Sequence, residues 1–318
     1  MRCLIACFCF LLLLTTTSQA QYRVILDADI DSDVDDAEAL AMLHAYADKK
    51  KIKFSGVIVT SGDPYAPLCA SAINKYYGRV RLPVGFLKNQ KEFKRESRYT
   101  KQISDEFPHR LKSHENAPDA VALYRKLLSK SPDESVIIVT IGHLTSLQNL
   151  LKSGGDKYSP LTGKALAEKK VAQWICMGGM YPEGKEANFY RPDPGSTNYC
   201  LQEWTKPITF VGWEAGNQIL TGGPYLKNKL NAKNPVYRAY ELYNNFAGRP
   251  SWDQLAVFLL DKKSEAYITR VAEGYCQVYE DGSNKWRPGP DRDHEYIIVK
   301  PEVDPEEVAR YLDDLVVK

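Results

Sequence analysis

The sequence has no excess of charge of either sign and no long hydrophobic run. Its 318 residues include 42 Lys and Arg against 40 Asp and Glu, which gives a formal net charge of +2. Proteins that bind nucleic acid mainly through charge have a marked basic excess or a basic stripe, so we expect no nucleic-acid partner. No apolar run reaches the roughly 18 residues that a membrane-spanning helix needs, so we expect no membrane span.

Cysteine is scarce beyond the N-terminus, and its spacing does not suit a metal site. Three of the seven cysteines lie in the first 20 residues, and the other four are Cys69, Cys176, Cys200 and Cys276. None of these four forms a Cys-x-x-Cys pair, which argues against a cysteine-based zinc site. In an oxidising compartment one or two disulfides can form, but four cysteines allow three pairings, and the sequence does not choose between them.

The first 20 residues have the pattern of a secretory signal peptide. Arg2 is followed by an apolar stretch over residues 4–14, and the segment ends in Ser18-Gln19-Ala20. A basic start, a short apolar segment and small residues at the end predict cleavage after Ala20 and a secreted or periplasmic protein. Residues 21–318 are then expected to form a single domain.

Short apolar runs alternate with longer apolar or amphipathic segments along most of the chain. Strands are predicted at residues 23–26, 54–60, 83–87, 135–140, 171–177 and 207–212, and helices at residues 37–47, 68–77, 117–128, 144–151, 236–246 and 252–260. This alternation predicts an α/β fold with an open, mostly parallel sheet and helices on both of its faces. Functional residues of such sheets gather at the carboxyl ends of the strands.

Two segments depart from this alternation. Residues 88–116 carry many charged and few aliphatic side chains, which indicates either a solvated surface insertion or a mobile flap over the site that would carry His109 and His114. Residues 270–318 are expected to form a C-terminal extension. Within it, residues 274–279 and 296–299 lie on either side of a turn at residues 281–283, which predicts a small antiparallel addition, closed by a helix over residues 305–317.

Six carboxylates lie within ten residues directly after the first predicted strand, in Asp27-Ala28-Asp29-Ile30-Asp31-Ser32-Asp33-Val34-Asp35-Asp36. Like charges this close repel one another unless a cation offsets them, which predicts a metal site. Oxygen ligands favour a hard ion, Ca²⁺ before Mg²⁺. An EF-hand loop starting at Asp27 is an alternative, although Ser32 stands where that loop needs Gly and a predicted strand stands where it needs a helix.

This acidic segment resembles the signature of the inosine-uridine preferring nucleoside hydrolase family, in which a strand leads into Asp-x-Asp, a turn and Asp-Asp-Ala at a helix start. Four more segments resemble family elements in the family's order, namely Val57-Ile58-Val59-Thr60-Ser61-Gly62-Asp63, Gly142-His143-Leu144-Thr145-Ser146-Leu147, Met177-Gly178-Gly179 followed by Glu186-Ala187-Asn188-Phe189, and Pro250-Ser251-Trp252-Asp253. The resemblance covers roughly residues 23–260 and implies the α/β fold of that family.

The resemblance also implies a metal site and a general base. One Ca²⁺ ion is expected to bind the carboxylates of Asp29, Asp36 and Asp253 and the backbone carbonyl of Ile141. Asp29 is expected to take a proton from a metal-bound water, which attacks C1′ of a ribosyl group. The implied function is a secreted, Ca²⁺-dependent N-ribohydrolase that cleaves a ribonucleoside to free base and ribose.

Substrate contacts follow from the same resemblance, with two departures from the family pattern. The residues implied to hold the ribose hydroxyls are Asp35, Glu186 and Asn188. Asp63 stands where Asn is usual, and Trp252 stands where many members have a His that can protonate the departing base; both are expected in the substrate site. Indole has no proton to transfer near neutral pH but can stack on a flat ring. His143 is a candidate for the missing acid, with a surface position as the alternative.

The other acids of the cluster are assigned supporting positions. Asp27 is expected to orient Asp29 or its loop, and Asp31 and Asp33 are expected to be solvated turn residues.

Two alternatives to a nucleoside hydrolase remain open. The departures at Trp252, Asp63 and Ser146 suit a related N-glycosidase that acts on another ribosyl compound, and a calcium-dependent nucleoside- or sugar-binding protein would keep the pocket without turnover. An NAD-type Rossmann enzyme is excluded, because no Gly-x-Gly-x-x-Gly follows the first predicted strand. The expected partner is a small-molecule nucleoside, and the resemblance permits a homo-oligomer.

Overall fold

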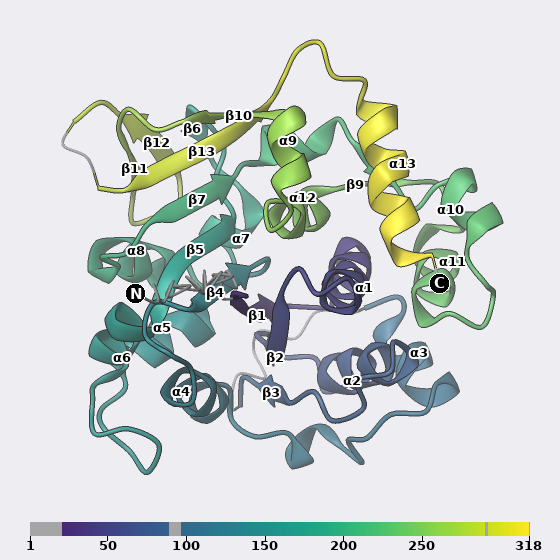
Figure 1. Ribbon diagram of the computed structural model, residues 1–318, viewed down its shortest axis with the longest axis horizontal. Helices are drawn as coiled ribbons and strands as arrows, with labels where there is room; N and C mark the ends of the chain where they lie inside the picture. Colours follow the sequence, from purple (N-terminus) through teal and green to yellow (C-terminus); the bar gives the residue numbers. More distant parts are fainter. Residues whose placement is uncertain (1–20, 89–96, 290–291, 318) are drawn as a thin grey trace, which may run out of the picture.

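A central sheet of eight strands organises the described chain, which comprises residues 21–88, 97–289 and 292–317 of a computed structural model (Figure 1). The strand order is β10-β13-β7-β5-β4-β1-β2-β3, and all neighbours are parallel except the antiparallel pair β10 and β13. The bounds are β1 (Arg23–Ala28), β2 (Lys53–Val59), β3 (Val84–Phe86), β4 (Val136–Thr140), β5 (Val171–Met177), β7 (Ile208–Val211), β10 (Ile268–Val271) and β13 (His294–Val299).

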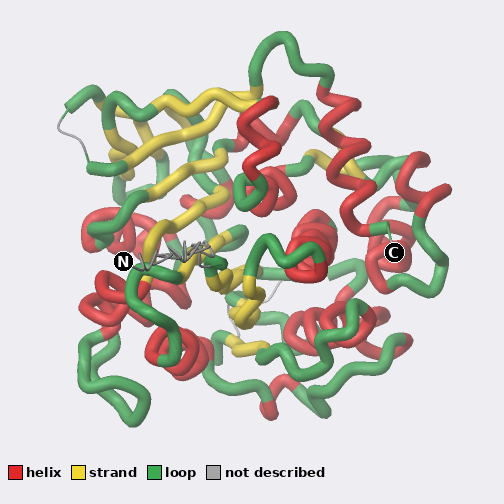
Figure 2. The backbone as a smooth tube through the Cα atoms, in the orientation of Figure 1, coloured by secondary structure: helices red, strands yellow, loops and turns green. Residues whose placement is uncertain are grey.

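Helices cover both faces of this sheet (Figure 2). Their bounds are α1 (Asp35–Asp48), α2 (Ala66–Tyr76), α3 (Thr100–Glu106), α4 (Ala120–Ser129), α5 (Thr145–Lys152), α6 (Gly163–Lys170), α7 (Ala187–Tyr190), α8 (Pro194–Glu203), α9 (Trp213–Asn217), α10 (Pro224–Lys229), α11 (Pro235–Asn244), α12 (Trp252–Phe258) and α13 (Pro305–Val316). Two small antiparallel sheets complete the fold, one of β11 (Tyr275–Val278), β12 (Asn284–Arg287) and β6 (Glu183–Gly184), the other of β8 (Leu220–Thr221) and β9 (Arg249–Pro250).

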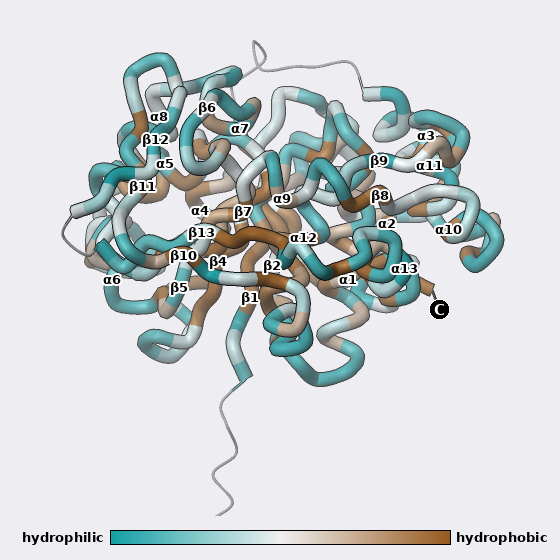
Figure 3. The backbone as a smooth tube through the Cα atoms, turned by 90° about the horizontal axis from the view of Figure 1, so that it is seen from above, coloured by the Kyte–Doolittle hydropathy of each residue, from teal (hydrophilic) through white to brown (hydrophobic). Residues whose placement is uncertain are grey.

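The strands are apolar on both sides because each side packs against a helix layer. In β1, Val24 and Leu26 belong to the core shared with α1, α2, α11, α12 and α13, whereas Ile25 belongs to the core shared with α4, α5, α6 and α8. Hydrophobic residues accordingly concentrate along the central strands, with hydrophilic segments around them (Figure 3). The expected α/β fold with a mostly parallel sheet is confirmed.

The predicted strands and helices all occur within a few residues of their expected bounds, but one predicted pairing is wrong. Residues 274–279 do not pair with residues 296–299. Instead β11 pairs with β12, across a turn in which the Tyr279 amide donates to the Ser283 carbonyl at 2.9 Å. Strand β12 was not predicted because its sequence is mostly polar. Strand β13 pairs with β7 in the central sheet, where Ile297 is buried.

The described part of the predicted charged insertion is an exposed surface segment that is anchored by a few buried residues. Tyr99 and Ile103 are buried at α3, which packs against α2 and α11. His109 contacts the backbone carbonyls of Ser104 and Leu111. The flap hypothesis falls partly on residues 89–96, which lie outside the described residues.

The cysteines of the described chain, Cys69, Cys176, Cys200 and Cys276, are all buried free thiols. None of the described helices combines the length and apolar character needed to cross a membrane. The predicted signal peptide, residues 1–20, lies outside the described residues.

We predict that Leu26→Ala lowers the free energy of unfolding by about 2–5 kcal/mol, because Leu26 is fully buried at the centre of the sheet. Urea denaturation followed by circular dichroism measures this change. Leu220→Ala is the matched control: Leu220 is 56% exposed, so its loss is expected to change stability by less than about 0.5 kcal/mol. Equal effects of the two substitutions would contradict the assigned core.

Candidate functional site

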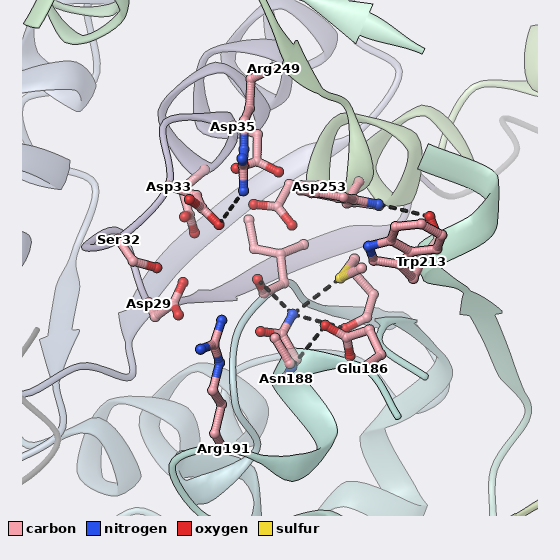
Figure 4. A pocket seen from close by; sticks show the side chains of 15 residues that line it. Asp29, Ser32, Asp33, Asp35, Glu186, Asn188, Arg191, Trp213, Arg249 and Asp253 are labelled. Carbon is pink, nitrogen blue, oxygen red and sulfur yellow. Dashed lines mark hydrogen bonds and ion pairs between the residues drawn. The ribbon is translucent and has the colours of Figure 1, made fainter. Parts of the chain in front are cut away.

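A polar pocket opens at the carboxyl ends of the central strands (Figure 4). Its walls come from the loop after β1, the start of α1, the residue after β4, the end of β5, α7 with the residues on either side of it, the start of α9, β9 and the start of α12. The lining residues are Asp29, Ser32, Asp33, Asp35, Asp36, Ile141, Met177, Glu186, Ala187, Asn188, Arg191, Trp213, Arg249, Trp252 and Asp253. This position is the one expected for the functional site of an open parallel sheet.

Three carboxylates in the pocket are close enough to share one cation. Asp35, Asp36 and Asp253 each offer an oxygen, and these oxygens lie within 4.8 Å of one another. All three residues are buried and stand in the first turns of α1 and α12, where the helix dipoles favour negative charge. Asp35 Oδ1 is buried and has no hydrogen-bond partner in the described part of the chain. This all-oxygen donor set fits a hard divalent cation.

The electrostatics of the cluster also favour a cation. Burial, and then repulsion from Asp29 and Asp253, raises the pKa of Asp36 well above its usual value. Burial, and then repulsion from Asp35, raises the pKa of Asp253 in the same way. Burial raises the pKa of Asp35 to about 7, with Asp33 adding to the rise. A bound cation would offset this repulsion and favour the ionised carboxylates.

Asp29 is fixed beside this cluster by the backbone around it. Ile30 adopts a left-handed conformation with φ 46°, which β-branched residues rarely do, and its amide donates to Asp36 Oδ1 at 3.2 Å. A Cβ atom on Gly142 would lie only 2.8 Å from the Asp29 backbone nitrogen. The loop after β4 can therefore approach Asp29 closely only because residue 142 is glycine.

The opposite wall presents a carbonyl, an amide and a buried carboxylate. Asn188 Nδ2 donates to the Ile141 carbonyl at 3.4 Å, which places this oxygen at the pocket. Glu186 Oε1 accepts from the Asn188 amide at 2.8 Å, and Glu186 Oε2 accepts from the Gly179 amide at 3.0 Å. Burial raises the pKa of Glu186 to about 7. These contacts leave an ordered set of polar groups around the pocket.

Aromatic and basic side chains form the remaining wall. Trp252 Nε1 donates to the Trp213 carbonyl at 2.8 Å. Arg249 lies over the Trp252 ring, and its Nη2 is 2.8 Å from Asp33 Oδ2. Arg191 extends into the pocket from the side of α7 and points toward Asp29 (Figure 4).

The structure brings most of the predicted site residues to this one pocket, namely Asp29, Asp35, Asp36, Ile141, Glu186, Asn188, Trp252 and Asp253. Asp63 is not among the lining residues of the described chain. Its carboxylate accepts from Thr100 Oγ1 at 2.6 Å and from the Tyr65 amide at 3.0 Å. His143 is also buried outside the described lining, with Nδ1 2.9 Å from Thr145 Oγ1.

Two of the supporting acids differ from expectation. Asp31 is buried rather than solvated, because Ser61 Oγ donates to its Oδ2 at 2.6 Å. Asp33 lines the pocket and pairs with Arg249. Asp27 is held by hydrogen bonds from Thr60 and Tyr124, and burial raises its pKa to about 7.

Sequence reasoning missed Ser32, Arg191, Trp213 and Arg249 in the lining. Trp213 lies just after strand β7, and Arg249 immediately precedes the Pro-Ser-Trp-Asp segment. Both positions could therefore have been predicted to lie near the site. Arg191 lies three residues after Asn188, directly after Phe189 and Tyr190, and no motif marks it.

We predict that added Ca²⁺ raises the melting temperature more at pH 8 than at pH 5. The raised carboxylate pKa values mean that the cation-free folded protein binds more protons than the unfolded chain. This contribution to stability is fully present below pH 3.8 and is lost as the pH rises to the raised value of about 7 for Asp35. A cation that binds the ionised cluster reverses the loss.

Thermal unfolding with chelator or with Ca²⁺ measures the effect. Asp36→Asn and Asp253→Asn should reduce the response to Ca²⁺, whereas Asp133→Asn, a change at a half-exposed side chain away from the pocket, should retain it. A response to Ca²⁺ that is equal at both pH values would contradict the assignment.

Comparison with known proteins identifies a family that matches most of the chain. The family model described as "Inosine-uridine preferring nucleoside hydrolase" matches residues 24–306, whereas a search of curated sequences finds no match. Among solved structures, a plant nucleoside hydrolase has 18% identity and a TM-score of 0.69, with 93% of this chain and 99% of that chain covered.

Two further structures share the fold. An inosine-uridine preferring nucleoside hydrolase from Bacillus anthracis has 16% identity and a TM-score of 0.68, with 94% and 99% of the chains covered. The type III effector protein XopQ, complexed with adenosine diphosphate ribose, has 14% identity and a TM-score of 0.64, with 94% of each chain covered. Because the family model spans most of the sequence, the chain belongs to the inosine-uridine preferring nucleoside hydrolase family of hydrolases acting on N-glycosyl bonds.

Proposed function

We propose that the protein is a Ca²⁺-dependent N-ribohydrolase that cleaves a ribonucleoside to free base and ribose. The observation that carries this proposal is the meeting of Asp29 with the buried cluster of Asp35, Asp36 and Asp253 in one pocket of a family member. The three clustered side chains are all carboxylates, and oxygen donors favour a hard ion such as Ca²⁺.

The proposed roles divide between the cation site and the proton acceptor. Asp36 and Asp253 would hold the ion together with the Ile141 carbonyl and Asp29, and Asp35, whose carboxylate lies in the same cluster, would bind the sugar. When bound, the ion would lower the pKa of a coordinated water. Asp29 takes the proton of the attacking water, and the water oxygen forms a bond to C1′ as the C1′–N bond breaks.

The sugar is held by the acids and the amide on opposite walls. Asp35 accepts hydrogen bonds from ribose hydroxyls on one side, and Glu186 and Asn188 bind them on the other. The Glu186 carboxylate is already oriented by two backbone amides. A sugar that lacks a hydroxyl would leave these buried groups unpaired, so we expect strong preference for ribose over deoxyribose.

A second candidate is an N-glycosidase that acts on a different ribosyl compound. Arg191 supports it, because this guanidinium brings a positive charge into a pocket otherwise rich in carboxylates and suits a substrate with an additional anionic group. The effector XopQ, with which this chain shares its fold, was solved in complex with such a ribosyl compound, adenosine diphosphate ribose.

We predict release of free ribose from at least one of inosine, uridine, adenosine and cytidine, with the activity abolished by chelator and restored by Ca²⁺. A colorimetric assay of reducing sugar measures the product. Activity on adenosine diphosphate ribose alone, followed as released adenine because this compound is itself a reducing sugar, would favour the second candidate. Binding of Ca²⁺ and nucleoside without product would identify a binding protein and contradict the proposed hydrolysis.

We predict that Asp29→Asn lowers kcat by roughly 100- to 10,000-fold, the range typical for loss of a general base. The amide keeps an oxygen near the cation but cannot accept the proton. Steady-state kinetics on the best nucleoside measure the loss, and Asp133→Asn, which changes a carboxylate remote from the pocket, serves as control. Full activity of Asp29→Asn would rule out the proposed base.

We also propose that the protein acts outside the cytoplasm, on the basis of the signal-like pattern of residues 1–20.

A further inference from the structure

Arg249 lies on the side of the pocket where Trp252 replaces a histidine. It is the first residue of β9 and precedes Trp252 by three positions. The centre of its guanidinium lies 4.9 Å from the centroid of the Trp252 ring. Because the Trp252 indole is anchored to the Trp213 carbonyl at 2.8 Å, this pairing of a planar cation with an aromatic ring has a fixed position in the pocket wall.

The acidic loop holds the guanidinium from its other side. Arg249 Nη2 is 2.8 Å from Asp33 Oδ2, and the Tyr243 hydroxyl donates to Asp33 Oδ1 at 2.9 Å. The backbone carbonyl of Asp33 accepts from the Tyr99 hydroxyl at 2.8 Å. Asp33 is therefore itself held at two points, which orders the guanidinium before any substrate binds.

The hydrogen-bonding capacity of Arg249 is only partly used. A guanidinium has five N–H donors in a planar fork. Within the described chain, Asp33 is its paired carboxylate, and the Arg249 Nε atom is buried without an acceptor. Arg249 also lies near Asp35, the residue proposed to hold the sugar (Figure 4). An ordered cation with spare donors thus borders the sugar site on its aromatic side.

We propose that Arg249 binds the departing base and stabilises the negative charge that develops on it, an inference that rests on the proposed N-ribohydrolase function. When the C1′–N bond breaks, its electron pair remains on the base nitrogen. The base then carries negative charge until solvent water gives it a proton, and the proton that Asp29 took from the attacking water returns to the hydroxide this leaves, which restores the carboxylate. A guanidinium N–H directed at an acceptor of the base stabilises this charge without transferring a proton.

This role accounts for the missing histidine. Trp252 cannot protonate the base, and His143 lies outside the described pocket lining. Charge stabilisation by a permanently protonated side chain needs no acid of matched pKa.

The test compares two substrates whose leaving groups differ in how much their negative charge needs to be stabilised by the enzyme. Wild type, Arg249→Met and Arg249→Lys are assayed on the best nucleoside of the four and on 4-nitrophenyl β-D-ribofuranoside, whose phenolate leaves readily unaided. Arg249→Met should lower kcat on the nucleoside roughly 100-fold, in the range for loss of one charge-stabilising donor, and leave kcat on the aryl riboside nearly unchanged. Arg249→Lys, which keeps the charge without the fork, should show a smaller loss that is again confined to the nucleoside.

Several outcomes would overturn the proposal. Equal losses on the two substrates would indicate a structural or sugar-binding role, and unchanged nucleoside turnover would remove any role. Melting temperatures with and without Ca²⁺ identify a variant that has lost its fold, and Arg249→Lys then decides the question alone. If wild type cleaves neither substrate, the N-ribohydrolase function itself fails, and the role of Arg249 fails with it.

Discussion

The pocket depends on keeping several carboxylates together away from water. Asp29, Asp35, Asp36, Glu186 and Asp253 are each buried and face one space. The chain offsets part of their mutual repulsion with helix N-termini at Asp36 and Asp253 and with backbone amides on Glu186. A cation bound at the cluster of carboxylate oxygens would offset the rest. The strand ends that converge on this space are what make such a site possible in a parallel sheet.

A second buried network ties together the two helices that supply the cluster. Glu38, two residues after Asp36 in α1, accepts hydrogen bonds from Tyr240 and from Gln254 Nε2, the latter at 3.1 Å. Gln254 follows Asp253 in α12, so this contact joins the first turns of α1 and α12, which supply the clustered carboxylates. Such a link between residues far apart in sequence helps to fix the spacing of the carboxylates, as the preorganisation of a metal site requires.

The sequence predicts the site better where the pattern is local. Six carboxylates directly after an apolar strand predict a metal site in this segment, but the family resemblance was needed to single out Asp29 and Asp36 among them. Asp253, more than 200 residues later, required a family pattern, because nothing local reveals that α12 begins beside α1. Asp63 shows the limit of assigning roles from the family pattern. It stands at a family site position, but its carboxylate accepts a hydrogen bond from Thr100 and does not line the described pocket. Strand β12 escaped prediction because its residues lack apolar alternation.

The arrangement of charge in the pocket matches the demands of breaking an N-glycosidic bond. In the proposed reaction the sugar becomes positive, like an oxocarbenium ion, while the base becomes negative. The carboxylates gather where the sugar would lie, and Arg249 with Trp252 stands on the aromatic side. Asp33, expected from sequence to be a solvated turn residue, links the two halves by holding Arg249 while its own loop carries Asp29 and Asp35. The acidic segment therefore positions both the carboxylates around the sugar and the guanidinium near the base. A shift of this segment would weaken the stabilisation of both developing charges.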